Sequence, residues 1–201
     1  MRLSAVELAC HRGGRSVFSG VSFAVASGEA LTISGRNGAG KSSLLRLVAG
    51  LLRIAAGRFS LEDGDPELSI AEQAHYLGHQ DALKGSLSVA ENLRFWTGFL
   101  GVRSADIGDS LETVGLGALA GLPAAYLSAG QRRRLSIARL IAVPRPIWLL
   151  DEPSSTLDTA AQDRLADLMR AHLAGGGLIL AASHGPIGLQ QTQELRLGEA
   201  Q

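Results

Sequence analysis

The segment Gly35-Arg36-Asn37-Gly38-Ala39-Gly40-Lys41-Ser42 has the spacing G-x-x-x-x-G-K-[ST], which indicates both a fold class and a chemistry. Glycines at these positions let backbone N–H groups turn inward around phosphate oxygens, and a following helix adds the positive potential of its N-terminus. In this pattern Lys41 reaches the outer phosphates of a nucleotide, and Ser42, followed by Ser43, offers a hydroxyl to Mg²⁺. The sequence therefore predicts a nucleotide-phosphate site.

The residues on either side predict a strand, a glycine loop and a helix. The apolar run 30–34 stops at Gly35, and leucines recur on one side of a helical pattern that starts at Lys41. Further along, the apolar runs 147–150 and 178–182 are separated by an amphipathic helical pattern at 159–173. Continuous apolar strands that alternate with helices are typical of a parallel sheet covered on both faces.

Two further regions complete the predicted organisation of the chain. The first third has short β-like runs at 3–9 and 17–26, separated by glycine turns. Residues 86–142 are mostly helical in pattern, and Pro144 and Pro146 follow them. We therefore expect a single domain over 1–201, with an α/β core and an inserted helical subdomain at about 86–142.

Composition and charge make some classes of partner and site less expected. The 19 basic residues balance the 19 acidic ones, so no charge excess suggests binding to nucleic acid or to an anionic membrane surface. The uncharged stretch 173–183 is too short to span a bilayer, which needs about 20 apolar residues. The first residues lack the apolar core of a secretory signal, and the single cysteine, Cys10, cannot form an internal disulfide. These features favour a cytoplasmic protein that binds no nucleic acid.

An apolar strand that ends in two carboxylates is the second chemical motif. The run 147–150 is followed by Asp151 and Glu152. Ligands of parallel sheets bind beyond the carboxyl ends of the strands, so Asp151 is expected beside the phosphate loop, where it can hold Mg²⁺ directly or through water. Glu152 has the chemistry to polarise the water that attacks the γ-phosphate.

The segment Leu127-Ser128-Ala129-Gly130-Gln131-Arg132-Arg133-Arg134 resembles the LSGGQ signature of ATP-binding cassette ATPases, with Ala129 in place of the first glycine. Ser128 suits a helix N-cap and Gly130 admits close backbone approach, so this helix start is an anion site in its own right. The resemblance implies that Ser128, Ala129, Gly130 and Gln131 bind the γ-phosphate of the ATP held by the opposite subunit.

The same resemblance covers the rest of the chain. It implies that Gln80 contacts Mg²⁺ and the attacking water, that the loop 154–158 touches the other subunit, and that His184 is a switch residue at the γ-phosphate. It also implies a P-loop NTPase fold with an N-terminal antiparallel β subdomain. Because each polar catalytic residue type is present, the sequence favours an active ATPase over a protein that only binds nucleotide.

The adenine site departs from the family pattern. Cassette proteins usually carry an aromatic side chain in the early loop, but the stretch around Cys10-His11-Arg12 has none. His11 or Arg12 can stack on the base by its planar face. Arg36, where many relatives have proline, is a smaller departure.

The segment 74–95 narrows the resemblance to one subfamily. Its Y-L-G-H-Q sequence, the lysine after it and the later E-N-L-x-F are similar to the ATP-binding subunit of the cytochrome c maturation haem exporter. This resemblance implies a homodimer with ATP and Mg²⁺ between its subunits. It also implies peripheral attachment to the cytoplasmic face of a bacterial inner membrane, with an integral-membrane subunit docking near Gln80 to Asn92. Haem is then the cargo, unless hydrolysis drives release of a haem-loaded carrier.

Other classes of protein remain as alternatives. One is the ATPase of another small cassette transporter. Another is a non-transport cassette ATPase that acts on ribosomes or DNA, although such proteins usually have two cassettes or a long inserted arm. The signature segment and His184 speak against a P-loop kinase or GTPase.

Overall fold

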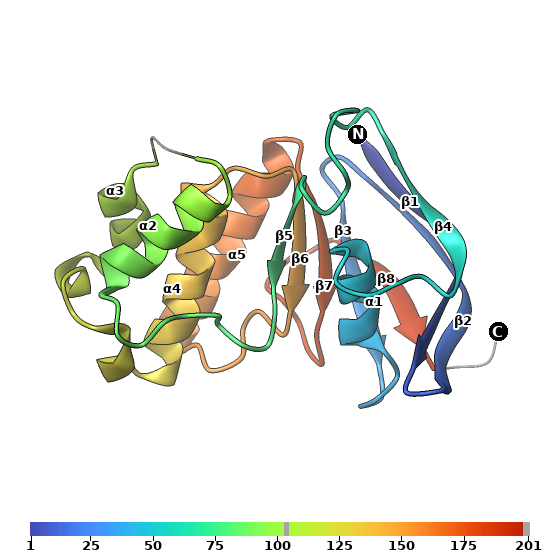
Figure 1. Ribbon diagram of the computed structural model, residues 1–201, viewed down its shortest axis with the longest axis horizontal. Helices are drawn as coiled ribbons and strands as arrows, with labels where there is room; N and C mark the ends of the chain where they lie inside the picture. Colours follow the sequence, from blue (N-terminus) through green and yellow to red (C-terminus); the bar gives the residue numbers. More distant parts are fainter. Residues whose placement is uncertain (103–104, 199–201) are drawn as a thin grey trace. The chain divides into compact units, whose positions relative to one another are not determined.

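The computed structural model describes residues 1–102 and 105–198 of the chain (Figure 1). The chain divides into two compact units. Unit 1 comprises Met1–Gly78, Arg145–Pro153 and Leu168–Gln201, and unit 2 comprises His79–Pro144 and Ser154–Asp167. Both sheets belong to unit 1, whereas unit 2 is helical.

The first sheet of unit 1 is antiparallel and has three strands. They are β1 (Arg2–Arg12), β2 (Arg15–Ala26) and β4 (Ala56–Glu62), in the order β2-β1-β4. Gly13 and Gly14 join β1 to β2, and both adopt positive φ, as the two-residue type I′ turn of a tight hairpin requires. Leu3 on the central strand pairs with Val25 on one side and Leu61 on the other.

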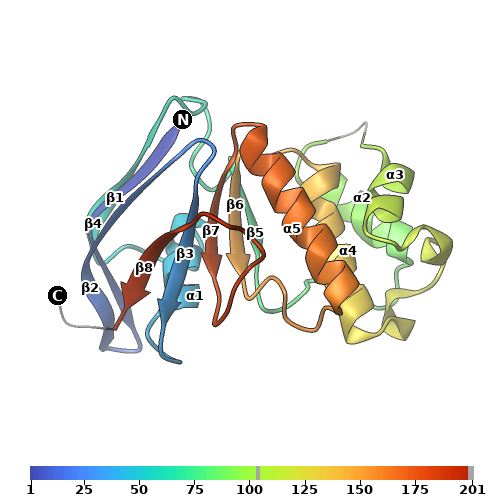
Figure 2. The same cartoon turned by 180° about the vertical axis from the view of Figure 1, so that it is seen from behind.

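The second sheet of unit 1 is parallel and has five strands (Figure 2). In spatial order they are β5 (Ala74–Leu77), β6 (Ile147–Asp151), β7 (Leu178–Ala182), β3 (Ala30–Gly35) and β8 (Gln193–Leu197). Every residue of β6 and β7 is buried, which explains their uninterrupted apolar sequences. The edge strand β8 is mostly exposed and correspondingly polar.

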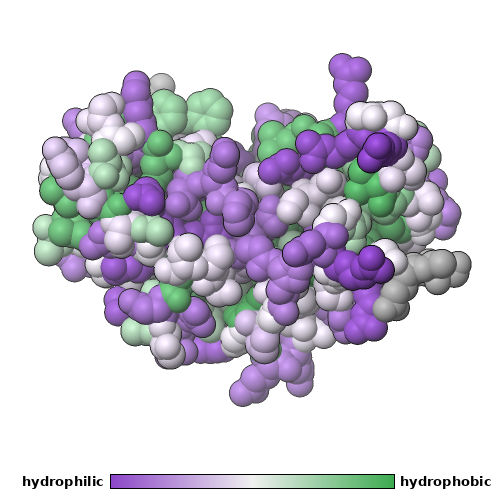
Figure 3. Space-filling model, turned by 90° about the horizontal axis from the view of Figure 1, so that it is seen from below, coloured by the Kyte–Doolittle hydropathy of each residue, from purple (hydrophilic) through white to green (hydrophobic). Residues whose placement is uncertain are grey.

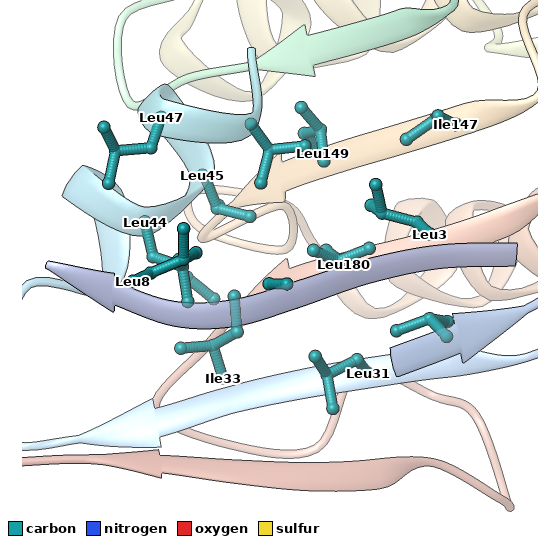
Figure 4. Packing of buried hydrophobic residues seen from close by; sticks show 14 of the residues in the cluster. Leu3, Leu8, Leu31, Ile33, Leu44, Leu45, Leu47, Ile147, Leu149 and Leu180 are labelled. Atoms are coloured by element: carbon teal, nitrogen blue, oxygen red, sulfur yellow. The ribbon is translucent and has the colours of Figure 1, made fainter. Parts of the chain in front are cut away.

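The hydrophobic core of unit 1 surrounds α1 (Lys41–Val48). Figure 4 shows leucines of α1 beside residues of β1, β3, β6 and β7, and the labelled members of this cluster are Leu3, Leu8, Leu31, Ile33, Leu44, Leu45, Leu47, Ile147, Leu149 and Leu180. Leu44 and Leu45 are fully buried. Burying a leucine side chain contributes about 1.5–3 kcal/mol, so this packing fixes the helix that follows the phosphate loop.

Unit 2 is helical. It contains α2 (Val89–Phe99), α3 (Ile107–Thr113), α4 (Ala129–Ala142), the short 3₁₀ turns Gly117–Leu119 and Ala124–Tyr126, and the first half of α5 (Thr159–Ala174). Leu93, Leu111, Leu116 and Leu135 are almost fully buried within it. Both α2 and α4 begin with a complete capping box, at Ser88 and Ser128.

The predicted fold class is confirmed. A mainly parallel sheet, an N-terminal antiparallel sheet and an inserted helical region are all present. The leucine pattern of the first helix continued to Leu51, but α1 ends at Val48, because Gly50 adopts a positive φ and Leu51 is exposed. Within 1–102 and 105–198, no helix is long and apolar enough to cross a membrane.

Candidate active site

The phosphate loop joins β3 to α1 in unit 1, as the sequence predicts. Gly35, the last residue of β3, has φ of 137°, and a Cβ there would overlap the carbonyl oxygen of Leu197. Gly40, just before α1, has φ of 101°, and a Cβ there would lie 2.7 Å from a methyl group of Val17 and 2.8 Å from the Phe18 ring. Both positions therefore require glycine for conformation and for space.

Lys41 folds back over this loop. Its ammonium nitrogen donates to the carbonyl oxygen of Gly35 at 2.8 Å and lies 3.5 Å from that of Arg36. The same nitrogen is 3.3 Å from Nε2 of His184. The side chain is 8% exposed, so its charge lies at the loop rather than in bulk solvent. An anion entering the loop would meet this charge together with the N-terminus of α1.

Ser42 and Asp151 meet at the ends of two different elements. Ser42 is the second residue of α1, and its hydroxyl donates a hydrogen bond to Oδ1 of Asp151 at 2.9 Å. Asp151 is the last residue of β6 and is 2% exposed. A half-buried hydroxyl and a buried carboxylate in contact supply the oxygen ligands that Mg²⁺ prefers. Ser43, the next residue of α1, is also buried.

Two residues that were not predicted as part of the site support the second carboxylate oxygen of Asp151. Tyr76 of β5 donates its hydroxyl proton to Oδ2 of Asp151 at 3.3 Å, and Nε of Arg46 donates to the Tyr76 hydroxyl at 3.2 Å. Burial raises the pKa of Tyr76, the Arg46 hydrogen bond opposes this rise, and Asp151 adds to it. The phenol therefore keeps its proton at neutral pH and can serve as a donor. Arg46 lies four residues after Ser42 and therefore on the same face of α1. This spacing is the feature of the sequence that could have placed Arg46 near the site.

Glu152 and His184 form the third part of the cluster. Oε1 of Glu152 lies 3.6 Å from Nε2 of His184, and the Glu152 backbone N–H donates to the carbonyl oxygen of Ala182 at 2.9 Å. Glu152 has φ of 48°, a left-handed conformation that costs about 1–2 kcal/mol for a non-glycine residue. Strained residues of this kind concentrate at functional sites. The structure therefore brings Lys41, His184 and Glu152 together in one row.

The predicted signature segment starts α4 in unit 2. Oγ of Ser128 accepts from the Gln131 backbone N–H at 3.2 Å, and Oε1 of Gln131 accepts from the Ser128 backbone N–H at 2.8 Å. A Cβ on Gly130 would lie 2.9 Å from the carbonyl oxygen of Thr156, so this glycine permits close approach of the loop 154–158. Ala129 occupies the first helical position. The Ser128 hydroxyl accepts in the cap and can still donate its own proton to an anion.

The remaining predicted residues lie apart from these contacts. Gln80 is exposed in the coil of unit 2 that follows β5, and its role at the nucleotide stays a prediction. His11 and Arg12 are exposed at the end of β1, as an adenine contact requires. Arg36 and Asn37 are exposed in the phosphate loop, and Gly38 has open space around its Cα. Figure 3 shows the molecule from below the view of Figure 1, and hydrophilic side chains predominate on this face.

The family model described as "ABC transporter" matches residues 18–155, which are more than half of the chain. The chain belongs to the ABC transporter family. It is an ATPase subunit of that family and binds ATP. This membership confirms the predicted superfamily.

Similar proteins narrow the relationship within the ABC transporter family. The chain is 63% identical to the "Cytochrome c biogenesis ATP-binding export protein CcmA" of Nitrobacter winogradskyi, over 100% of both chains. It is 54% identical, again over 100% of both chains, to the protein of the same description in Mesorhizobium japonicum. The predicted resemblance to the cytochrome c biogenesis subfamily is therefore confirmed.

Solved structures share the fold. A putative ABC transporter ATP-binding protein from Pyrococcus furiosus has a TM-score of 0.83 at 22% identity and covers 98% of each chain. A bacterial Atm1-family ABC exporter with ATP bound also has a TM-score of 0.83 at 22% identity, and it covers 98% of this chain and 37% of its own.

Proposed function

We propose that this chain is the ATP-hydrolysing subunit of an exporter for c-type cytochrome biogenesis, with haem as its cargo. The observation that carries the ATPase assignment is the cluster of Lys41, Ser42, Asp151, Glu152 and His184 at the ends of β3, β6 and β7. The export role rests on 54–63% identity, over the full length, to proteins named as cytochrome c biogenesis export proteins. The whole chain, 1–201, acts as one nucleotide-binding domain with a helical subdomain at about 86–142.

The phosphate loop binds the β- and γ-phosphates of ATP. Backbone N–H groups of residues 35–43 donate to phosphate oxygens, and the ammonium group of Lys41 adds charge and up to three donors. Its 2.8 Å bond to Gly35 holds the side chain over the loop. The longer contacts to Arg36 and His184, at 3.5 and 3.3 Å, are the ones that a phosphate would replace.

Ser42 and Asp151 suit Mg²⁺. They offer one hydroxyl and one carboxylate, and Mg²⁺ in nucleotide sites is held by few protein oxygens together with phosphates and water. The described residues contain no group of three or more His, Cys, Asp or Glu side chains that could hold a metal ion without the nucleotide. Gln80 is the further ligand we propose. When bound, Mg²⁺ neutralises charge that develops on the phosphate oxygens.

Glu152 acts as the general base. It takes a proton from the attacking water as the new oxygen–phosphorus bond forms and the bond between the γ-phosphorus and the bridging oxygen breaks, which releases ADP and phosphate. Nε2 of His184 can accept a hydrogen bond from Lys41 at 3.3 Å or direct an N–H toward Oε1 of Glu152 at 3.6 Å, but it cannot do both at once. His184 therefore exchanges partners when the γ-phosphate arrives, and it donates to a phosphate oxygen.

Two copies of the chain hold two ATP molecules head to tail. Each site combines residues 35–43, Gln80, Asp151, Glu152 and His184 of one copy with Ser128, Ala129, Gly130 and Gln131 of the other. The capped N-terminus of α4 supports this arrangement, because its uncompensated N–H groups and the Ser128 hydroxyl attract an anion. In this arrangement the second copy presents this helix to the nucleotide.

An integral-membrane subunit docks on the region from Gln80 to Asn92, which places the chain at the cytoplasmic face of the inner membrane. Two exposed aromatic rings close to this segment in the sequence support the proposal that an apolar surface of the partner docks here. Phe95 and Phe99 of α2 are 57% and 71% exposed, and their rings stack with centroids 6.2 Å apart. Exposed apolar clusters of this kind mark contact surfaces.

Membrane fractionation tests the transporter role. The chain should pellet with inner membranes only when its membrane subunit is coexpressed, and a Phe95→Ser/Phe99→Ser variant should pellet less. Tyr126→Ser is the matched control, because Tyr126 is 75% exposed but lies outside the docking region. Membrane pelleting without the subunit, or pelleting with ribosomes, would contradict the proposal; the latter would favour a non-transport ATPase. Unchanged haem delivery on loss of the chain would favour another small transporter.

A further inference from the structure

The residue after Gln80 is tied to the signature helix. Oδ1 of Asp81 lies 3.5 Å from Nη1 of Arg133, and the carbonyl oxygen of Asp81 accepts from the Ser136 hydroxyl at 3.0 Å. Arg133 and Ser136 both belong to α4. The Arg133 side chain is 2% exposed and that of Asp81 is 22% exposed, so water and salt screen their attraction only weakly.

The next residue is held by α2. The carbonyl oxygen of Ala82 accepts from the indole N–H of Trp96 at 3.1 Å, and Ala82 has the unusual φ of 52°. The Trp96 ring in turn lies 4.5 Å from the guanidinium carbon of Arg139 on α4. Burial lowers the pKa of Arg139 to about 10, while Asp81 opposes this shift and Arg133 adds to it. Asp81 thus places a negative charge beside two buried arginines of α4.

These contacts connect two functional segments of the proposed ATPase. Arg133 lies two residues after Gln131 in the same regular helix, so a displacement of Arg133 also displaces the signature segment. Asp81 lies one residue after Gln80. In the proposed dimer Gln80 acts in the chain's own ATP site, whereas the signature segment acts in the site of the partner copy.

We propose that Asp81 and Arg133 are positioning residues whose ion pair links the two ATP sites of the dimer, because it fixes the Gln80 segment to the signature helix. This inference rests on the proposed function. Loss of either partner would break the ion pair, so that the Ser136 hydrogen bond would remain as the described direct contact of Asp81 with α4, and the Gln80 segment would follow the movement of α4 less closely. Occupancy of one ATP site would no longer affect the other through this route.

The test measures ATP hydrolysis by the complete transporter as a function of ATP concentration. We expect a wild-type Hill coefficient near 2. Asp81→Asn and Arg133→Gln should each lower it toward 1 and lower kcat by about tenfold, with the dissociation constant of ATP changed by less than about twofold. The double variant should be no worse than the more affected single variant, because the two residues act through one contact. Arg133→Lys should restore most of the cooperativity.

Arg134→Gln is the matched control. Arg134 is the next residue of α4, and its guanidinium donates to the carbonyl oxygens of Val114 and Gly115 at 3.1 and 2.9 Å, away from the Gln80 segment. We expect a similar loss of thermal stability and an unchanged Hill coefficient. Asp81 and Arg133 variants that behave like Arg134→Gln, or a wild-type Hill coefficient of 1, would overturn this inference but leave the proposed function intact. Absence of wild-type hydrolysis would contradict the proposed function as well.

Discussion

At the scale of single residues, Asp151 shows how the site is held. Its two carboxylate oxygens accept from Ser42 on α1 and from Tyr76 on β5, so two elements fix one side chain. Arg46 holds Tyr76 in turn. An Asp151 carboxylate with fixed orientation loses little side-chain entropy when it binds its ligand.

Tyr76→Phe tests this support. The variant removes the hydroxyl that bridges Arg46 and Asp151, so we expect the free energy of unfolding to fall by about 1 kcal/mol. ATP turnover should fall several-fold, with ATP affinity unchanged, because the phosphate loop itself is intact. Urea unfolding and a steady-state ATPase assay measure the two effects. Tyr126→Phe, at an exposed tyrosine, should change neither, and equal behaviour of the two variants would exclude a role for Tyr76.

The contrast between Tyr76 and the predicted residues shows what a sequence reveals at this scale. Lys41, Ser42, Asp151 and Glu152 were predicted because their residue types stand at a motif's spacing or at the end of an apolar strand. Arg46 belongs to no motif, and Tyr76 belongs only to the Y-L-G-H-Q segment that indicates the subfamily, which predicts no contact with Asp151. Their contact with Asp151 depends on the order of the strands in the sheet, in which β5 neighbours β6, and that order is a tertiary property.

At the scale of elements, the start of α4 combines a structural and a proposed chemical role. Ser128→Ala removes the cap and should destabilise the protein by about 1 kcal/mol. The side chain of Asp106 caps α3, because its Oδ1 accepts from the Asp109 backbone N–H at 2.9 Å. Asp106→Ala removes this cap and should lower the free energy of unfolding by a similar amount. Only Ser128→Ala should abolish ATP turnover. Similar turnover in both variants would show that Ser128 serves the helix alone.

The end of α5 contributes a pH-dependent contact. The imidazole of His172 stacks on Trp148 of β6 with centroids 4.0 Å apart. Burial lowers the pKa of His172, although hydrogen bonds to the carbonyl oxygens of Leu178 and Pro146 oppose the shift. The unfolded chain therefore binds a proton more readily than the folded one near and below pH 6.5, and stability falls as the pH falls through that range.

Urea unfolding at pH 7.5 and pH 5.5 measures this contribution as the difference between the wild type and His172→Gln. The variant should be less stable at pH 7.5, where the wild-type stack is intact, and should lose less stability on acidification. A pH dependence that is the same for both proteins would contradict the proposed protonation of His172.

Some strands could be predicted from the sequence pattern and others could not. The runs at β3, β6 and β7 are apolar because both sheet faces are covered, and all three were predicted. In contrast, β4 and β8 are exposed edge strands with mixed composition, and β5 has four residues, so none gives a clear period. These three strands form only through pairing with neighbours far away in the sequence.

At the scale of the whole molecule, the proposed ATPase needs more than one copy of the chain. Lys41, Asp151, Glu152 and His184 lie in unit 1, whereas the signature segment lies in unit 2 and is proposed to act on the ATP of the partner copy. ATP binding should therefore promote dimerisation, and hydrolysis should reverse it.

The most direct test of the central claim is ATP turnover by Glu152→Gln, measured together with the oligomeric state by size-exclusion chromatography in ATP and Mg²⁺. We predict ATP affinity within about twofold of the wild type, turnover reduced at least about 100-fold, and a dimer that persists only with ATP. Glu67→Gln, at an exposed glutamate outside the site, is the control and should behave like the wild type. Turnover by Glu152→Gln equal to that of the wild type would contradict the account.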